Sequence, residues 1–177
     1  CSIIFGVKEI DTKVLINNKT YVFFSHTYKI NKETLNNAQG TPGMDKKKLL
    51  KSVLEKNIKL IDYENIRDKN SSRYLGFGRF AGIVGCYNTL NLCLENSNKK
   101  PLARAHRINN YERIMSNLKN VYFPKMNILL TGDGRVAKGV IELLKQTNIK
   151  EVSKENFLNH NFDNPVFCNL ETKDYVE

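Results

Sequence analysis

Short apolar runs alternate with amphipathic stretches along the chain. The runs over 2–7 and 20–25 are continuous rather than alternating, which is typical of strands that are covered on both faces. A polar segment over 31–43, with Asn-Asn, Gln-Gly and Pro-Gly pairs, predicts a loop. Leucine and valine at helical spacing then predict a helix over 45–56, and the apolar run over 58–62 predicts the next strand.

The same alternation continues in the second half of the chain. A short strand is expected over 74–78, and Gly82 and Gly85 in the apolar stretch behind it indicate a helix that packs closely on another element. Strands that alternate with helices predict βαβ units in parallel sheets, which is an α/β fold class. A polar linker over 95–101 follows, and a boundary near residues 95–120 separates two such pieces. The expected helices are 80–94, 111–119 and 135–146, and the expected strands are 126–130, 149–152 and 166–168.

One segment of the second piece has the pattern of a dinucleotide site. The predicted strand over 126–130 runs into Gly132-Asp-Gly134-Arg-Val-Ala137, and an apolar helix follows at once. Gly132 permits a tight turn, Gly134 leaves room for a pyrophosphate beside the backbone, and Ala137 lets the helix pack on the strand. The alternative is a glycine-rich turn that serves packing alone. The expected cofactor-binding residues are Gly132, Gly134, Arg135, Val136 and Ala137.

The end of the next strand bears on the choice between NAD and NADP. In such units an acidic residue there accepts the ribose hydroxyls of NAD. The segment reads Glu151-Val-Ser153-Lys154. Ser153 at the ribose position, with Lys154 beside it, would suit a 2′-phosphate, whereas Glu151 at that position would favour NAD. We therefore expect NAD or NADP, with NADP preferred and Ser153 as a further cofactor-binding residue.

Two chemically active side chains follow the first two predicted strands directly. Lys8 comes after the first apolar run and His26 after the second, with Glu9 and Lys29 close behind them. Ligands of parallel α/β sheets collect beyond the carboxyl ends of the strands, so Lys8 and His26 would project into one cleft. Such a pair suits proton transfer near neutral pH. The alternative is that both are structural or solvent-exposed strand ends.

Charge and cysteine content narrow the class of protein. The formal net charge is +10, but the basic residues are scattered, without an aromatic-interleaved stripe or zinc-finger spacing, so no nucleic-acid partner is expected. No apolar run approaches the roughly 18 residues of a membrane helix, so no membrane partner is expected. The four cysteines lie far apart and predict buried thiols in a reducing, cytoplasmic setting, with no metal site. Arg73 and Arg79 are candidates to clamp a carboxylate.

Five short segments follow one another along the chain: Ile4-Phe-Gly-Val-Lys-Glu9, Phe24-Ser-His-Thr-Tyr-Lys29, Leu60-Ile-Asp-Tyr-Glu64, Phe77-Gly-Arg-Phe-Ala-Gly82 and Thr131-Gly-Asp-Gly-Arg-Val-Ala-Lys-Gly139. In this order they resemble the saccharopine dehydrogenase and lysine–ketoglutarate reductase family, which is related to alanine dehydrogenase and the transhydrogenase nucleotide domain. The third segment and the Ser-His-Thr of the second are most similar to the lysine–ketoglutarate reductase branch.

The resemblance implies two Rossmann-like parallel-sheet domains with a cleft between them, both incomplete in this chain. Residues 1–108 would form the substrate-side domain, truncated at its start, and residues 109–177 the first half of the NAD(P)-binding domain. Members of the family are much longer than this chain, which is therefore expected to be a fragment without activity of its own. The loop over 31–43 is also longer than the usual link in the family.

The resemblance also implies roles for individual residues. Lys8 and His26 match the catalytic pair, and Glu9 matches an acid that modulates it. Lys29 and Arg73 match positions near the substrate carboxylates. These five residues are the expected catalytic and substrate-binding groups.

Three hypotheses for function follow. The first is an NAD(P)-dependent oxidoreductase on a secondary amine, which interconverts saccharopine with lysine and 2-oxoglutarate. The second is an alanine-dehydrogenase-like enzyme that reduces a 2-imino acid. The third is a non-catalytic nucleotide-binding regulatory module, against which the retention of both Lys8 and His26 counts. The expected partners are small amino acids and 2-oxo acids, and the sequence leaves the oligomeric state open.

Overall fold

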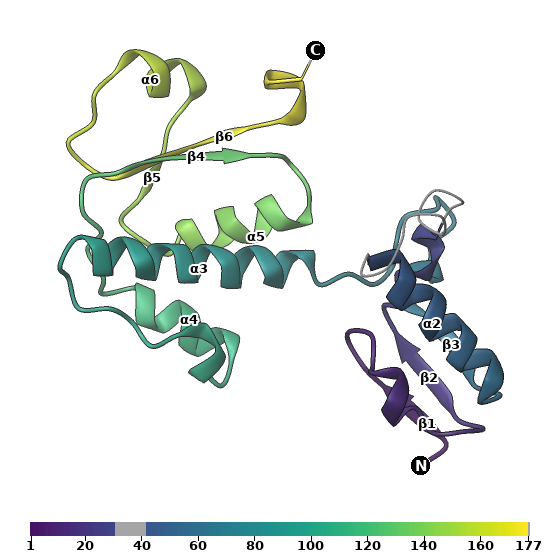
Figure 1. Cartoon of the computed structure of the whole chain (residues 1–177). Coiled ribbons are helices and arrows are strands. Elements are labelled where there is room, and N and C mark those ends of the chain that lie inside the picture. Colours follow the sequence, from purple (N-terminus) through teal and green to yellow (C-terminus); the bar gives the residue numbers. More distant parts are fainter. Residues whose placement is uncertain (31–41, 177) are drawn as a thin grey trace. The chain divides into compact units, whose positions relative to one another are not determined.

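The computed structural model describes residues 1–30 and 42–176 and divides the chain into two compact units, Cys1–Gly76 and Phe77–Glu177 (Figure 1). Each unit combines helices with a three-stranded parallel sheet, which confirms the α/β class and the two Rossmann-like pieces. The division between the two units falls after Gly76, which is earlier along the chain than the domain boundary expected after residue 108. The long helix that follows residue 77 packs within the second unit, so it belongs there structurally.

The sheet of the first unit has the order β1-β2-β3. Its strands are β1 (Ile3–Phe5), β2 (Thr20–Phe23) and β3 (Lys59–Asp62), and α2 (Pro42–Glu55) precedes β3 along the chain. The predicted strands and the predicted helix over 45–56 therefore form. Most of the loop predicted over 31–43 lies outside the described residues.

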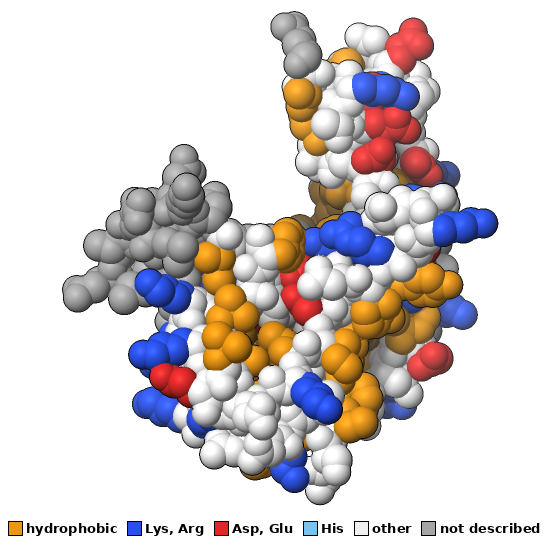
Figure 2. Space-filling model, turned by 90° about the vertical axis from the view of Figure 1, so that its right-hand side faces the viewer, with side chains coloured by type: hydrophobic (Ala, Val, Ile, Leu, Met, Phe, Trp, Pro, Cys, Tyr) orange, Lys and Arg blue, Asp and Glu red, His pale blue; other side chains and the backbone are white. Residues whose placement is uncertain are grey.

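One face of this sheet is well covered by the described part of the first unit, and on the other only the central Val22 is buried. Tyr21 and Phe23 of β2 pack with Leu49 and Val53 of α2 into a buried cluster. On the opposite face Phe5 of β1 is 71% exposed, and Ile3 and Ile61 are also exposed. Figure 2 shows several patches of hydrophobic side chains on the surface that it presents. The expectation of strands covered on both faces is thus met on one face only.

The sheet of the second unit has the order β4-β6-β5, with all neighbours parallel. The last strand of the chain therefore lies in the middle of this sheet. The elements of the unit are α3 (Gly78–Asn96), α4 (Tyr111–Leu118), β4 (Asn127–Thr131), α5 (Arg135–Leu144), β5 (Lys150–Glu151), α6 (Lys154–Asn159) and β6 (Val166–Leu170).

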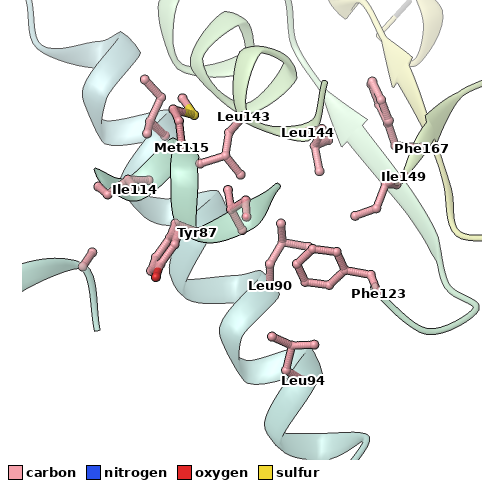
Figure 3. Close-up of a cluster of buried hydrophobic side chains, with 13 residues drawn as sticks. Tyr87, Leu90, Leu94, Ile114, Met115, Phe123, Leu143, Leu144, Ile149 and Phe167 are labelled. Atoms are coloured by element: carbon pink, nitrogen blue, oxygen red, sulfur yellow. The ribbon is translucent and has the colours of Figure 1, made fainter. Parts of the chain in front are cut away.

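The core of the second unit joins three helices to the sheet. Buried apolar residues recur along α3 at helical spacing, as the sequence pattern predicts. Figure 3 shows that they point toward side chains of α4, α5 and the sheet. The residues labelled there are Tyr87, Leu90, Leu94, Ile114, Met115, Phe123, Leu143, Leu144, Ile149 and Phe167.

A glycine contact sets how closely α3 and α5 approach. A Cβ atom at Gly82 would lie 2.1 Å from the Val136 carbonyl oxygen, and one at Gly139 would lie 2.0 Å from the Arg79 carbonyl oxygen. The two helices therefore touch backbone to backbone. The close packing expected at Gly82 is confirmed, whereas a Cβ at Gly85 would meet no atom within 4 Å among the described residues.

A salt bridge reinforces the same helix pair. Arg79 of α3 donates two hydrogen bonds of 2.6 Å to the Glu142 carboxylate of α5, and Tyr111 of α4 donates a third. Arg79 and Tyr111 hold the pKa of the Glu142 carboxyl below its usual range. Arg79, one of the two arginines expected to bind a carboxylate, thus binds the carboxylate of Glu142 in its own unit.

One predicted strand does not form, and one helix of the structure has no counterpart among the predicted elements. The strand predicted over 74–78 is wrong: Arg73 forms only an isolated antiparallel bridge with Arg67 across a turn, and Tyr74 is 72% exposed. The helix α6 carries no strong apolar periodicity, and its start is marked by Ser153, whose hydroxyl accepts from the Asn156 N–H. None of the described helices is long and apolar enough to cross a membrane.

We predict opposite effects for two substitutions in α3. Gly82→Ala forces its methyl group against the backbone of α5 and lowers the free energy of unfolding by about 1–3 kcal/mol. Gly85→Ala, in open space on the same helix, raises it by up to about 1 kcal/mol because alanine is the better helix former. Urea unfolding of the two variants measures both. Equal stability of the two variants would contradict the close contact.

Candidate functional site

The carboxyl ends of β1 and β2 lie side by side beyond the regular strands. The Gly6 N–H donates to the Val22 carbonyl at 2.9 Å, and the Phe24 N–H donates to the Val7 carbonyl at 3.2 Å. Lys8 and His26 follow these paired segments directly. Their backbones therefore leave the same edge of the sheet, as the reasoning from strand ends anticipates.

His26 is held in an unusual backbone conformation by an acid from the next strand. Its φ of 54° and ψ of 17° lie in the left-handed region, which non-glycine residues rarely adopt. The His26 N–H donates to Oε2 of Glu64 at 2.8 Å. The ring Nδ1 lies 2.8 Å from the same oxygen without making a hydrogen bond to it. Both the backbone and the ring of His26 are thus placed by one carboxylate.

Glu64 is a buried acid that lies between His26 and Arg73. It is only 1% exposed, and it lies in a short 3-10 helix directly after β3. Its Oε1 lies 3.3 Å from Nη1 of Arg73. Arg73 also donates to the Tyr28 hydroxyl at 2.6 Å, and its guanidinium lies 5.4 Å from the centre of the Tyr28 ring. Because a buried charge is costly unless it is paired, these contacts explain how Glu64 is accommodated.

A second acid fixes the residues on either side of His26. The buried Asp62, the last residue of β3, accepts from the Ser25 and Glu64 N–H groups at 3.4 and 2.9 Å. The Ser25 hydroxyl also donates to Asp62, and it lies 2.8 Å from the Thr27 hydroxyl. The Ser25-His26-Thr27 turn is therefore tied to the end of β3 at several points. These bonds restrict the position of the His26 backbone, which a side chain needs if it is to act at a fixed point.

The other expected residues of this site are Lys8, Lys29 and Glu9. Lys8 is exposed just past β1, and the side chain of Lys29 lies outside the described part of the structure. Glu9 lines a pocket of about 510 Å³ with Asp11, Thr12 and residues of α2, and His26 is not among the lining residues. The structure thus brings together His26 and Arg73, through Glu64, and places Lys8 at the same sheet edge.

The turn after β4 has the geometry that a dinucleotide needs. Gly132 has a φ of +95°, which a side chain would strain, and its N–H donates to the Leu170 carbonyl at 2.8 Å. Gly134 is the N-cap of α5, no side chain caps this helix, and a Cβ at Gly134 would meet nothing within 4 Å in the described residues. Ala137 is buried, whereas Arg135 and Val136 are exposed at the helix start. These residues fit a pyrophosphate against the positive end of α5.

The strand order places Ser153 away from β4. In this sheet β6 lies beside β4, and β5 lies on the far side of β6. The hydroxyl of Ser153, just after β5, caps α6. The first residue after the strand that neighbours β4 is Glu171, whose carboxylate lies 2.6 Å from Nζ of Lys173. An acid and a cation thus lie together at that strand end, and a cofactor role of Ser153 stays a prediction.

Sequence reasoning missed the two acids that organise the site. Asp62 and Glu64 stand in one of the five resembling segments, yet neither was expected to contact His26. The available signal was their position: acidic residues at the end of a third parallel strand lie at the same edge as the ends of the first two. That they are buried follows only from the packing.

The cysteines are all free thiols, and they differ in exposure. Cys168 is buried, Cys86 and Cys93 are partly buried, and Cys1 is exposed. Burial, and secondarily the nearby Cys93, raises the pKa of the Cys86 thiol to about 12. The reactive thiolate form of Cys86 is therefore disfavoured near neutral pH.

Several proteins named alpha-aminoadipic semialdehyde synthase are similar in sequence to this chain. No model of a known protein family matches the chain. Mouse mitochondrial alpha-aminoadipic semialdehyde synthase is 30% identical over 178 residues, which cover 86% of this chain and 18% of the mouse protein. The bovine mitochondrial protein of that name is 28% identical over 182 residues, which cover 88% of this chain and 18% of the relative. The Arabidopsis thaliana protein is 33% identical over 90 residues, which cover 51% of this chain and 7% of the relative.

Among solved structures, an L-alanine dehydrogenase aligns with 95% of this chain and 42% of its own, at 11% identity and a TM-score of 0.48. The chain spans only about 18% of the length of the animal relatives, whose names place them in mitochondria, so the expected cytoplasmic location gains no support. The sequence similarity confirms the resemblance carried by the five segments: the chain is homologous to part of the alpha-aminoadipic semialdehyde synthases and so to the saccharopine dehydrogenase and lysine–ketoglutarate reductase family.

Proposed function

We propose that this chain is part of an NAD(P)-dependent oxidoreductase that acts on a secondary amine and interconverts saccharopine with lysine and 2-oxoglutarate. The observation that carries the proposal is the turn at His26, locked by two buried acids at the sheet edge where Lys8 also emerges. The names of the relatives support an enzyme of amino acid metabolism. The proposal concerns the whole protein, of which this chain supplies two pieces.

In this proposal the first unit handles protons and substrate. Lys8 and His26 form the acid–base pair: one acts on the substrate amine, and the other moves the proton of the oxygen that is lost or gained as the imine forms or is hydrolysed. Glu64 is a positioning residue that sets the orientation of the His26 ring. Arg73 and Tyr28 offer donors to a substrate carboxylate next to this ring.

The second unit would hold the dinucleotide. Gly132 and Gly134 leave the backbone open to the pyrophosphate, and the start of α5 attracts its charge. Either NAD or NADP suits this turn. When bound, the nicotinamide would donate or accept the hydride at the carbon of the C=N bond.

The direct test uses the full-length protein. We expect Lys8→Met and His26→Gln each to lower kcat about 10²–10⁴-fold, the range of general acid–base catalysis, with dinucleotide affinity nearly unchanged. Oxidation of NADH or NADPH that depends on lysine and 2-oxoglutarate measures kcat, and quenching of protein fluorescence measures binding. Unchanged kcat in both variants would remove these residues from the mechanism. Turnover of pyruvate and ammonia instead would point to an alanine-dehydrogenase-like enzyme.

Glu64 can be tested as a positioning residue. Glu64→Gln keeps an acceptor for the His26 N–H but removes the charge beside the ring and beside Arg73. We expect kcat to fall at least about tenfold, equivalent to about 1.4 kcal/mol of transition-state stabilisation, because the ring is held less well. The KM for dinucleotide stays near the wild-type value. A parallel loss of kcat and of thermal stability, with no partial recovery in Glu64→Asp, would indicate a structural role alone.

The dinucleotide turn offers a substitution that spares the fold. Gly134→Ala places a methyl group in space that is open in the structure, where the phosphates would approach. The backbone there, with φ of −75°, accepts alanine without strain. We expect the Kd for NADH or NADPH to rise about tenfold or more, a loss of about 1.4 kcal/mol, at unchanged melting temperature. Gly85→Ala is the matched control, and equal affinity in the two variants would count against this turn as the binding site.

A further inference from the structure

A basic pocket in the second unit has no place in the proposed reaction. It has a volume of about 800 Å³ and lies between the segment over 100–110 and α4. Its charged lining residues among those described are Lys100, Arg107 and Arg113, and no acidic residue lines it. The residues of the dinucleotide turn are not part of it. Pockets of roughly 300–1,000 Å³ are typical of small-molecule sites.

The wall of this pocket is anchored to the core. Asn91 of α3 is buried, and its amide donates to the Leu102 carbonyl at 2.9 Å and accepts from the Leu102 N–H at 2.7 Å. The buried Tyr87 donates to the Ala103 carbonyl at 3.0 Å. On the other side Asn110 caps α4 by accepting from the Arg113 N–H. The backbone of the pocket wall is therefore fixed on both sides, which lowers the part of the entropic cost of binding that comes from ordering the chain.

The three cations of the pocket lack the counter-charges that their neighbours have. Five ion pairs join cations and acids within the described part of the second unit, and none involves Lys100, Arg107 or Arg113. Three like charges around one pocket repel each other. An anion bound among them would be attracted by all three and would reduce this repulsion. The planar guanidinium groups of two arginines match the oxygens of a phosphate group.

We propose that this pocket binds an organic phosphate of about nucleotide size. Lys100, Arg107 and Arg113 would neutralise its phosphates, and the amides of Asn109 and Asn117 line the same hollow. Its apolar lining residues, Leu102, Ile108 and Val121, suit a ring system. The lining contains no aromatic side chain on which successive bases could stack, which disfavours single-stranded RNA. This site is independent of the proposed function.

The test uses the 177-residue chain and ATP without magnesium, with adenosine as the uncharged control. We expect ATP to bind and adenosine not to bind in isothermal titration. Arg107→Gln with Arg113→Gln raises the Kd for ATP about tenfold or more, whereas Lys119→Gln with Lys150→Gln, which removes the same charge at exposed positions outside the pocket, changes it less than about twofold.

Amide chemical shifts of the unsubstituted chain provide a second measurement that depends on no variant. ATP should move the signals of residues 100–121, including those of Asn109 and Asn117, rather than those of 132–137. Equal losses of affinity in the two double variants, shifts confined to 132–137, or binding of polyuridylate in preference to ATP would each overturn the proposal.

Discussion

The first unit depends on one electrostatic constraint, the burial of Glu64 at the carboxyl end of β3. A carboxylate that is 1% exposed requires partners, and it finds them in the His26 N–H, the His26 ring and Arg73. Those contacts hold His26 in the left-handed region and bring Arg73 beside Tyr28. The same pairing that makes the buried charge tolerable therefore builds the candidate site.

The second unit depends on a steric constraint instead. The backbones of α3 and α5 touch at Gly82 and Gly139, and Arg79 joins the helices through Glu142. This contact holds the start of α5, where Gly134 opens the backbone, against the long helix of the core. A phosphate site made of backbone N–H groups requires such a fixed helix start, because no side chain can adjust to the ligand.

Much of the local structure could be predicted from the sequence. The helices from α2 to α5 form where amphipathic or apolar stretches predict them, and the turn at Gly132 follows from its glycines and its strand–helix context. The prediction failed for the short run around Tyr74, because apolar residues form a strand only where a neighbouring strand offers hydrogen bonds. The position of β6 between β4 and β5 could not be predicted either, because the order of strands in a sheet is set by contacts distant in sequence.

The sequence by itself determined the α/β class, the glycine turn and the location of Lys8 and His26 at strand ends, since these depend on residues that are neighbours along the chain. Only the tertiary structure decided that Asp62 and Glu64 are buried against Ser25 and His26, that β6 separates β4 from β5, and that three cations line one pocket. Burial and strand order arise from contacts between segments far apart in the chain, and the pocket depends on how the segment over 100–110 is held against α3 and α4; local patterns encode none of these.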